Sequence, residues 1–118
     1  MSKTGADLIS DAKSRIVEIA PDQAKKVLAA GGATFLDVRE PQEYNLGRLP
    51  GAVHVPRGML EVKVESLIPL DANIVVYCAA GARSALAADT LHQMGYTNVS
   101  SLQGGFRDWA MSGGVVEE

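Results

Sequence analysis

The chain has a single cysteine, Cys78, and the residues around it favour nucleophilic chemistry at its sulfur. The apolar run 73–77 predicts a buried strand that ends directly before Cys78. Small residues follow at 79–82, and a helical stretch begins at Arg83. A thiol at this junction lies beside backbone N–H groups of the first helical turn, which have no partner within the helix.

The start of a helix favours the ionised form of such a thiol. Its unpaired N–H groups and its partial positive charge together bind anions. A thiolate in this position has a pKa lowered from about 8.5 to roughly 3.5–7.5. Gly81 can adopt positive φ, which lets several amides point at one atom. Ala79, Ala80 and Ala82 are too small to block access, and the Arg83 guanidinium suits oxyanions.

Two other interpretations of this segment are open. A free cysteine often packs as a small apolar residue with no chemical role. A Gly-containing loop between a strand and a helix can also bind a nucleotide, but this one lacks the Gly-Lys-Ser/Thr ending that nucleotide loops use. The strand, the glycine and the arginine together favour a reactive Cys78.

Length, composition and charge limit the remaining possibilities. The 118 residues fit one domain with a substantial core, since 47% are hydrophobic. A net charge of −3 predicts no nucleic-acid surface. The start of the chain has no apolar signal core, and no run is long enough to span a membrane. One cysteine cannot form an internal disulfide, which agrees with a reducing compartment, so we expect a cytoplasmic protein.

No metal site or cofactor is expected. The two histidines, His54 and His92, lie far apart in the sequence and have no cysteine partners. A zinc or other transition-metal site needs several such ligands at short spacing. The chemistry predicted for Cys78 uses the sulfur alone.

Apolar strands alternate with helical segments, which predicts an α/β fold with a parallel sheet. We expect strands at 16–19, 34–38, 52–55, 73–77 and 98–102. We expect helices at 6–14, from Pro21 to the Gly31–Gly32 pair, in a short turn after Arg39, and at 59–67, 83–94 and 106–111. In the helix at 59–67, the residues Leu60, Val64 and Leu67 are predicted to share the buried face.

Several separated motifs, in this order, resemble a single-domain rhodanese, a sulfurtransferase family. They are Leu36-Asp37-Val38-Arg39, Glu43-Tyr44, Gly47 to Ala52, Val55-Pro56, the segment Cys78 to Ser84, Gly104-Gly105-Phe106 and Trp109. The most specific is Cys78-Ala79-Ala80-Gly81-Ala82-Arg83-Ser84, which is similar to the Cys-x-x-Gly-x-Arg-Ser loop of many members. The resemblance runs from about Ile16 to Trp109.

The resemblance implies a fold and a domain division. The fold is a single rhodanese-like domain with a central, mostly parallel five-stranded sheet and helices on both faces. We expect this domain at 16–112, preceded by an N-terminal helical extension at 1–15 and followed by a flexible tail at 113–118.

The resemblance also implies a mechanism. The Cys78 thiolate attacks the outer sulfur of a small anionic donor such as thiosulfate, and a persulfide forms. A small thiol, cyanide or a protein acceptor then takes the sulfur. The loop residues Ala79, Ala80, Gly81, Ala82 and Arg83 would bind the anionic sulfur.

Supporting roles are expected for Asp37, Arg39 and Ser84, next to the loop or at the end of the second strand. Arg83 either steers the anionic donor or braces the loop by pairing with a carboxylate, and Asp37 is the expected partner for that brace. Trp109 is expected in the core. Many family members have His-Ile where this chain has Arg48-Leu49, and the loop lacks the extra cations that some thiosulfate-preferring members carry beside the cysteine.

Four other functions are weighed against these motifs. A cysteine phosphatase of related fold has one more residue between cysteine and arginine than the four found here, and an arsenate reductase has the same loop requirement. A non-catalytic binding module often lacks the cysteine that this chain keeps. A persulfide carrier for one protein partner shares every motif above, so the sequence leaves that alternative open.

Overall fold

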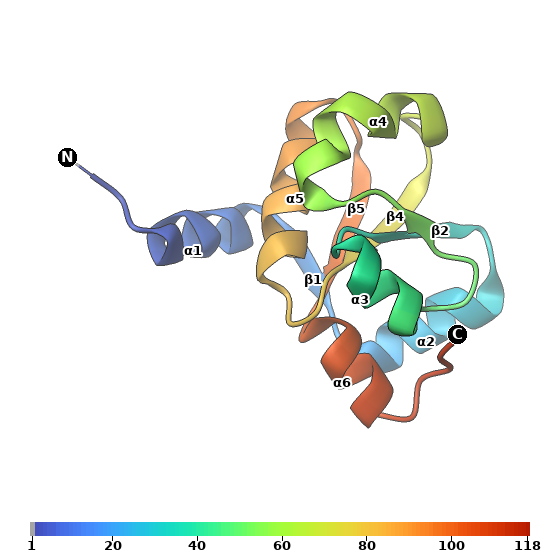
Figure 1. Ribbon diagram of the computed structural model, residues 1–118. Helices are drawn as coiled ribbons and strands as arrows, with labels where there is room; N and C mark the ends of the chain where they lie inside the picture. The colour runs from blue at the N-terminus through green and yellow to red at the C-terminus, as the bar shows by residue number, and fades with distance from the viewer. Residues whose placement is uncertain (1) are drawn as a thin grey trace.

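The computed structural model describes residues 2–118 as a five-stranded sheet with helices packed on both faces (Figure 1). The strands are β1 (Val17–Ile19), β2 (Ala33–Asp37), β3 (Val53–His54), β4 (Asn73–Tyr77) and β5 (Asn98–Leu102). Their order is β1-β5-β4-β2-β3, and every pair of neighbours is parallel. The α/β fold and the position of each predicted strand are confirmed, and β4 lies at the centre of the sheet.

Two helices cover each face of the sheet. The helices α2 (Pro21–Ala30) and α6 (Gly105–Met111) pack on one face, and α4 (Leu60–Leu67) and α5 (Ala82–Gln93) pack on the other (Figure 1). The short helix α3 (Pro41–Leu46) follows β2, and a 3₁₀ turn, η1 (Arg57–Met59), precedes α4. All strands are parallel, so the loops that follow them meet at one edge of the sheet.

Strand alternation divides the core into two halves. Ile74, Val76 and Cys78 of the central segment face α4 and α5. Val75 and Tyr77 face α2 and α6, where Trp109 is 1% exposed. The core position expected for Trp109 is therefore confirmed. The Cys78 side chain lies on the face of the sheet that α4 and α5 cover.

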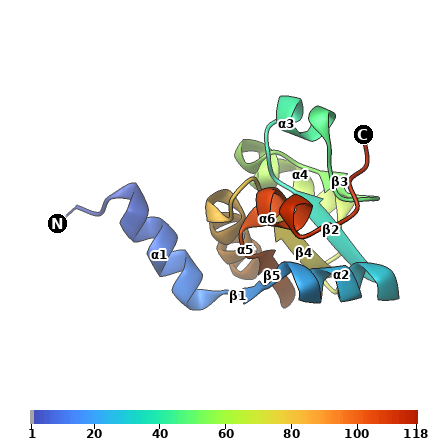
Figure 2. The ribbon, with the colours of Figure 1, turned by 90° about the horizontal axis from the view of Figure 1, so that it is seen from below.

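The N-terminal helix α1 (Gly5–Arg15) extends away from the sheet and its C-terminal end meets α5 (Figure 2). Ala12 is fully buried in this contact, and Arg15 makes two hydrogen bonds with the Asp89 carboxylate, of 3.0 and 2.8 Å. Within residues 2–118, no helix has the length and apolar character needed to cross a membrane.

The face predicted for the helix at 59–67 is partly wrong. Leu60 and Val64 are buried, but Leu67 is 53% exposed. Leu67 is the last residue of α4, and the chain turns there into an extended conformation at Ile68. Ile68 takes the core position instead and is 3% exposed.

The segment 113–118, predicted as a flexible tail, has defined partners in the structure. The Gly114 N–H donates to the Trp109 carbonyl, and Glu117 exchanges two backbone hydrogen bonds with Arg48, of 2.9 and 2.8 Å. Flexibility of this segment stays a prediction, but its backbone is held against α6 and the loop after α3.

Candidate active site

Cys78 lies where β4 ends, and its sulfur takes the place of a helix cap. The N-terminal cap of α5 is Gly81, which has φ of +109° and no side chain. A capping side chain normally accepts a hydrogen bond from the second or third N–H of a helix. Here Cys78 Sγ accepts from the Ser84 N–H at 3.3 Å and from the Gly81 N–H at 3.1 Å. One N–H from the first turn of α5 and the N–H of its cap residue therefore point at the sulfur.

Two buried hydroxyls form a hydrogen-bonded chain that leads to the sulfur. Ser84 Oγ is 3.5 Å from Cys78 Sγ and 3.3 Å from the Gly81 carbonyl oxygen, to which it donates. Ser101 on β5 donates to Ser84 Oγ at 2.8 Å. Both serines are fully buried. Sequence reasoning missed Ser101, although a polar residue at a core position of a strand is itself a signal, since buried polar groups need partners.

These donors set the ionisation of the sulfur. Burial by itself raises the pKa of the Cys78 thiol, because it removes water from the charged form. Hydrogen bonds from the Ser84 hydroxyl and from the N–H groups of Ser84, Gly81 and Ala80 outweigh that effect, so the pKa lies below its usual value. Cys78 is 1% exposed, and the groups that donate hydrogen bonds to its sulfur are neutral amides and a hydroxyl.

Asp37 and Arg39 form a buried ion pair at the end of β2. Arg39 donates to the Asp37 carboxylate from its backbone and its guanidinium, and its Nη2 also donates to the Gly47 carbonyl at 2.7 Å. The guanidinium lies over the Phe106 ring, 4.4 Å from its centre. The pair thus ties the loop after β2 to α6 beside the Cys78 loop. Neither residue is hydrogen-bonded to the sulfur.

The partner expected for Arg83 was wrong. Arg83 pairs with Glu43 of α3 through two hydrogen bonds of 2.8 and 3.1 Å, and not with Asp37. Asp37 is unavailable because its own near neighbour Arg39 occupies both carboxylate oxygens. The Arg83 hydrogen bonds lower the pKa of Glu43 to about 2, so the pair stays ionised at neutral pH.

Helix α6 holds the Cys78 loop from the other side. The Phe106 N–H donates to the Cys78 carbonyl at 2.8 Å, and the Arg107 N–H donates to the Ala79 carbonyl at 3.1 Å. Gly105 lies so close that a Cβ built on it would be 2.5 Å from the Cys78 carbonyl oxygen, and its φ is +60°. Glycine is therefore required at this position for α6 to approach the loop.

The structure brings most of the predicted site residues together. Residues 79–81 form the turn between β4 and α5, with Ala80 exposed and Gly81 buried, and Ala82, Arg83 and Ser84 follow in the first turn of α5. His54 lies apart from the sulfur, with Nε2 2.8 Å from the Arg39 carbonyl oxygen and its ring stacked on Tyr44. Within residues 2–118, no cluster of three or more His, Cys, Asp or Glu side chains could hold a metal ion.

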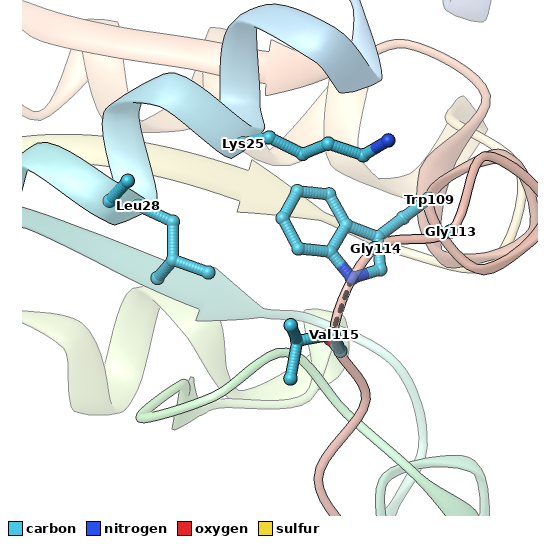
Figure 3. A pocket seen from close by; sticks show the side chains of 7 residues that line it. Lys25, Leu28, Trp109, Gly113, Gly114 and Val115 are labelled. Atoms are coloured by element: carbon cyan, nitrogen blue, oxygen red, sulfur yellow. Dashed lines mark hydrogen bonds between the residues drawn. The ribbon is translucent and has the colours of Figure 1, made fainter.

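A separate cavity of about 350 Å³ lies on the opposite face, between α2 and the segment after α6 (Figure 3). Leu28, Trp109 and Val115 line it, and Trp109 Nε1 donates to the Val115 carbonyl. Lys25 at its edge already donates to the Ser112 carbonyl. No residue of the Cys78 loop lines this cavity, so its size says nothing about the chemistry of the sulfur.

A parallel α/β sheet with a cysteine loop between its central strand and a helix defines the class of this protein. The family model described as the rhodanese-like domain matches residues 20–112, and the chain belongs to that family. This confirms the resemblance found in the sequence motifs.

Individual relatives sharpen the placement. A protein named thiosulfate sulfurtransferase GlpE from Pseudomonas paraeruginosa is 41% identical over 77% of this chain and 81% of its own length. A protein named putative sulfur carrier protein YrkF from Bacillus subtilis is 36% identical over 91% of this chain. The chain spans only 58% of the length of that second relative.

Solved structures show the same fold. A protein of unknown function from Rhodopseudomonas palustris, described as a possible tyrosine phosphatase, superposes with a TM-score of 0.89. It is 32% identical and the match covers 99% of this chain and 96% of that one. A rhodanese-related protein from Thermoplasma volcanium matches 86% of this chain and 97% of its own with a TM-score of 0.78 and 32% identity.

The close approach of Gly105 to the loop predicts a large effect of Gly105→Ala. The new Cβ overlaps backbone atoms of the loop and the residue needs positive φ, so we expect unfolding to become easier by at least about 3 kcal/mol. Gly51→Ala is the matched control, because Gly51 has φ of +71° with open space around it, and it should lose only about 1 kcal/mol. Urea unfolding measures both. Equal losses would show that α6 is not pressed against the loop.

The Arg83–Glu43 pair predicts opposite shifts in the ionisation of Cys78. Arg83→Ala removes a cation near the sulfur and leaves Glu43 unpaired, so the pKa of Cys78 should rise by about half a unit. Glu43→Gln leaves Arg83 as an uncompensated cation, so the pKa should fall by a similar amount. The pH dependence of iodoacetamide alkylation measures both. If neither variant moves the midpoint, Arg83 acts only as scaffold.

Proposed function

We propose that the protein is a sulfurtransferase that moves sulfane sulfur from a small anionic donor such as thiosulfate to a thiophilic acceptor through a persulfide on Cys78. The observation that carries this proposal is the sulfur itself, which accepts two backbone N–H groups and has a lowered pKa although it is buried. The family and the sulfurtransferase name of a relative at 41% identity support it.

The proposed reaction has two covalent steps. The Cys78 thiolate attacks the outer sulfur of thiosulfate, a new S–S bond forms, and sulfite leaves with the electrons of the broken S–S bond. The charge then lies on the outer sulfur, which the amides of the loop 79–83 would bind. In the second step cyanide, a thiol or a protein thiolate attacks that outer sulfur, and the Cys78 thiolate is regenerated.

A phosphatase function is weighed because one structural neighbour is described as a possible tyrosine phosphatase. Four residues separate Cys78 from Arg83, one fewer than in cysteine phosphatases, so the ring of amides is smaller. The Arg83 guanidinium is also committed to Glu43 through both of its hydrogen bonds. Both features favour a sulfur ligand over a tetrahedral phosphate, and the same loop length disfavours an arsenate reductase.

A persulfide carrier is the second candidate, favoured by the relative named putative sulfur carrier protein. In that case the acceptor is one protein partner rather than a small thiophile. The proposed site residues are the same for both candidates, with Cys78 as nucleophile, residues 79–83 as the anion site, and Asp37, Arg39 and Ser84 in support. A single cysteine suits a reducing compartment such as the cytoplasm in either case.

The persulfide is tested by intact mass. Incubation with thiosulfate should add the mass of one sulfur atom to the protein, and Cys78→Ser should gain none and lose sulfur transfer to cyanide. An aryl phosphate assayed beside thiosulfate should give no turnover. A protein that gains no sulfur from thiosulfate or from a panel of persulfide donors is not a sulfurtransferase.

The identity of the sulfur acceptor distinguishes a sulfurtransferase enzyme from a persulfide carrier. The loaded protein is mixed with cyanide, with glutathione and with buffer alone, and loss of the added mass is followed over time. Rapid discharge to the small thiophiles supports the enzyme. A persulfide that survives all three while the unloaded protein alkylates normally supports the carrier.

A further inference from the structure

Ser101 is a buried hydroxyl one step removed from the reactive sulfur. It lies on β5, and β5 pairs with β4, the strand that ends at Cys78. Its side chain is fully buried on the face of the sheet that α5 covers. Within residues 2–118, its hydroxyl has Ser84 Oγ as its single side-chain partner, at 2.8 Å. A buried hydroxyl proton without an acceptor is unfavourable, so the Ser101 proton points at Ser84.

This direction fixes what Ser84 can do with its own proton. Each hydroxyl has one proton to donate and can accept as well. Because Ser84 Oγ accepts from Ser101, its proton is left with two acceptors in reach, the Gly81 carbonyl at 3.3 Å and Cys78 Sγ at 3.5 Å. When Cys78 is a neutral thiol, its S–H donates to Ser84 Oγ, and Ser84 donates to Gly81. Every proton in the group then has an acceptor.

Ionisation of the sulfur reverses one of these bonds. The thiolate has no proton to donate and attracts the Ser84 proton by its charge. A rotation about the Cβ–Oγ bond of Ser84 turns that proton from the Gly81 carbonyl to Sγ. Ser101 keeps donating to Ser84 throughout, and hydrogen bonds in such a chain strengthen one another.

We propose that Ser101 is a positioning residue that acts through Ser84. By donating to Ser84 Oγ, Ser101 orients the Ser84 proton away from itself and toward Cys78 Sγ, where that proton stabilises negative charge on the sulfur. Ser101 makes its side-chain hydrogen bond to Ser84 and not to the sulfur. Its effect on the sulfur is transmitted by one hydroxyl.

The same pair distinguishes the free thiolate from the persulfide, a consequence that rests on the proposed function. In a persulfide the charge lies on the outer sulfur, one S–S bond of about 2.05 Å away from Sγ. Sγ is then an uncharged atom and a poor acceptor, so the Ser84 proton returns to the Gly81 carbonyl. The Ser101–Ser84 pair therefore favours the sulfur-free enzyme over the loaded one.

Charged groups lie on the elements around the Cys78 loop, and the test must leave them unchanged. They are the Arg83–Glu43 pair from α5 and α3, the Asp37–Arg39 pair from β2, Arg107 and Asp108 from α6, and Arg57 with Glu61 from η1 and α4. None of them is hydrogen-bonded to Ser101 or Ser84. Replacement of Ser101 by alanine removes one neutral hydroxyl and leaves these charges in place.

The test is a double-mutant cycle read by the pH dependence of iodoacetamide alkylation. Ser101→Ala should raise the alkylation midpoint of Cys78 by about half a unit, about a threefold loss of thiolate at a fixed pH below the midpoint. Ser84→Ala should raise it by about one unit, a tenfold loss. In the Ser84→Ala background, Ser101→Ala should have no further effect, because the group that transmits it is gone.

Ser100→Ala is the matched control. Ser100 is the preceding residue of β5, is only half-buried and faces the other side of the sheet. Its replacement should leave the midpoint unchanged. An unchanged midpoint in Ser101→Ala, or an equal shift with and without Ser84, overturns the proposal. Thermal unfolding of each variant is measured to check that the variant is folded.

The persulfide provides a second measurement. At equal thiosulfate and sulfite, the loaded fraction measured by intact mass should be about threefold higher, as a ratio of loaded to free, in Ser101→Ala at a pH where Cys78 is ionised in both proteins. If the wild-type protein takes up no sulfur at all, the proposed function fails. The alkylation cycle still decides the role of Ser101, because alkylation needs only the thiolate.

Discussion

The hydrogen bond from the Ser84 N–H to Cys78 Sγ is the interaction on which the site depends. It closes the N-terminus of α5, which begins at a glycine and has no side-chain cap of its own. Gly81 has φ of +109°, a conformation that a side-chain-bearing cap residue rarely adopts. The sulfur therefore completes the helix, and the helix in turn provides the donors that stabilise the sulfur as an anion. The hydrogen bond between the Ser84 N–H and the sulfur therefore contributes both to the stability of α5 and to the reactivity of Cys78.

That contact holds only if the loop is kept in place from two sides. Parallel strands bring the loops after β2, β4 and β5 to one edge of the sheet. The loop after β5 contributes Gly105 and the first N–H groups of α6, which bind the Cys78 and Ala79 carbonyls. The loop after β2 contributes Arg39, which is held by Asp37 and packs its guanidinium over Phe106 of α6. The buried ion pair supports the site through α6, without a hydrogen bond to the sulfur.

Local patterns predicted the fold and the reactive loop, whereas contacts between distant segments could not be read from them. The strand before Cys78, the glycine and the start of the helix after it are encoded within residues 73–84. The partner of Arg83 is 40 residues away, and the expected Asp37 was excluded by a competitor two residues from it. Ser101 became relevant only because β5 pairs with β4, a register that no local pattern specifies. The buried position predicted for Leu67 was wrong for a related reason. The helix ends at Leu67 and the chain becomes extended at Ile68, so Ile68 enters the core instead.

The ion pair and the neutral hydrogen-bond donors near the sulfur differ in exposure and in distance from it, and they therefore have different roles. The Arg83–Glu43 pair is about one-third exposed, so its field at the sulfur is screened by water and by salt. With the pKa of Glu43 at about 2, the pair carries the same charges throughout the neutral range and cannot switch the site there. The amides of Gly81 and Ser84 and the hydroxyl of Ser84 are buried and lie within 3.5 Å of Sγ, where screening has little effect. The charge on Cys78 is therefore governed by neutral donors, while the ion pair at the surface fixes the position of the loop that carries them.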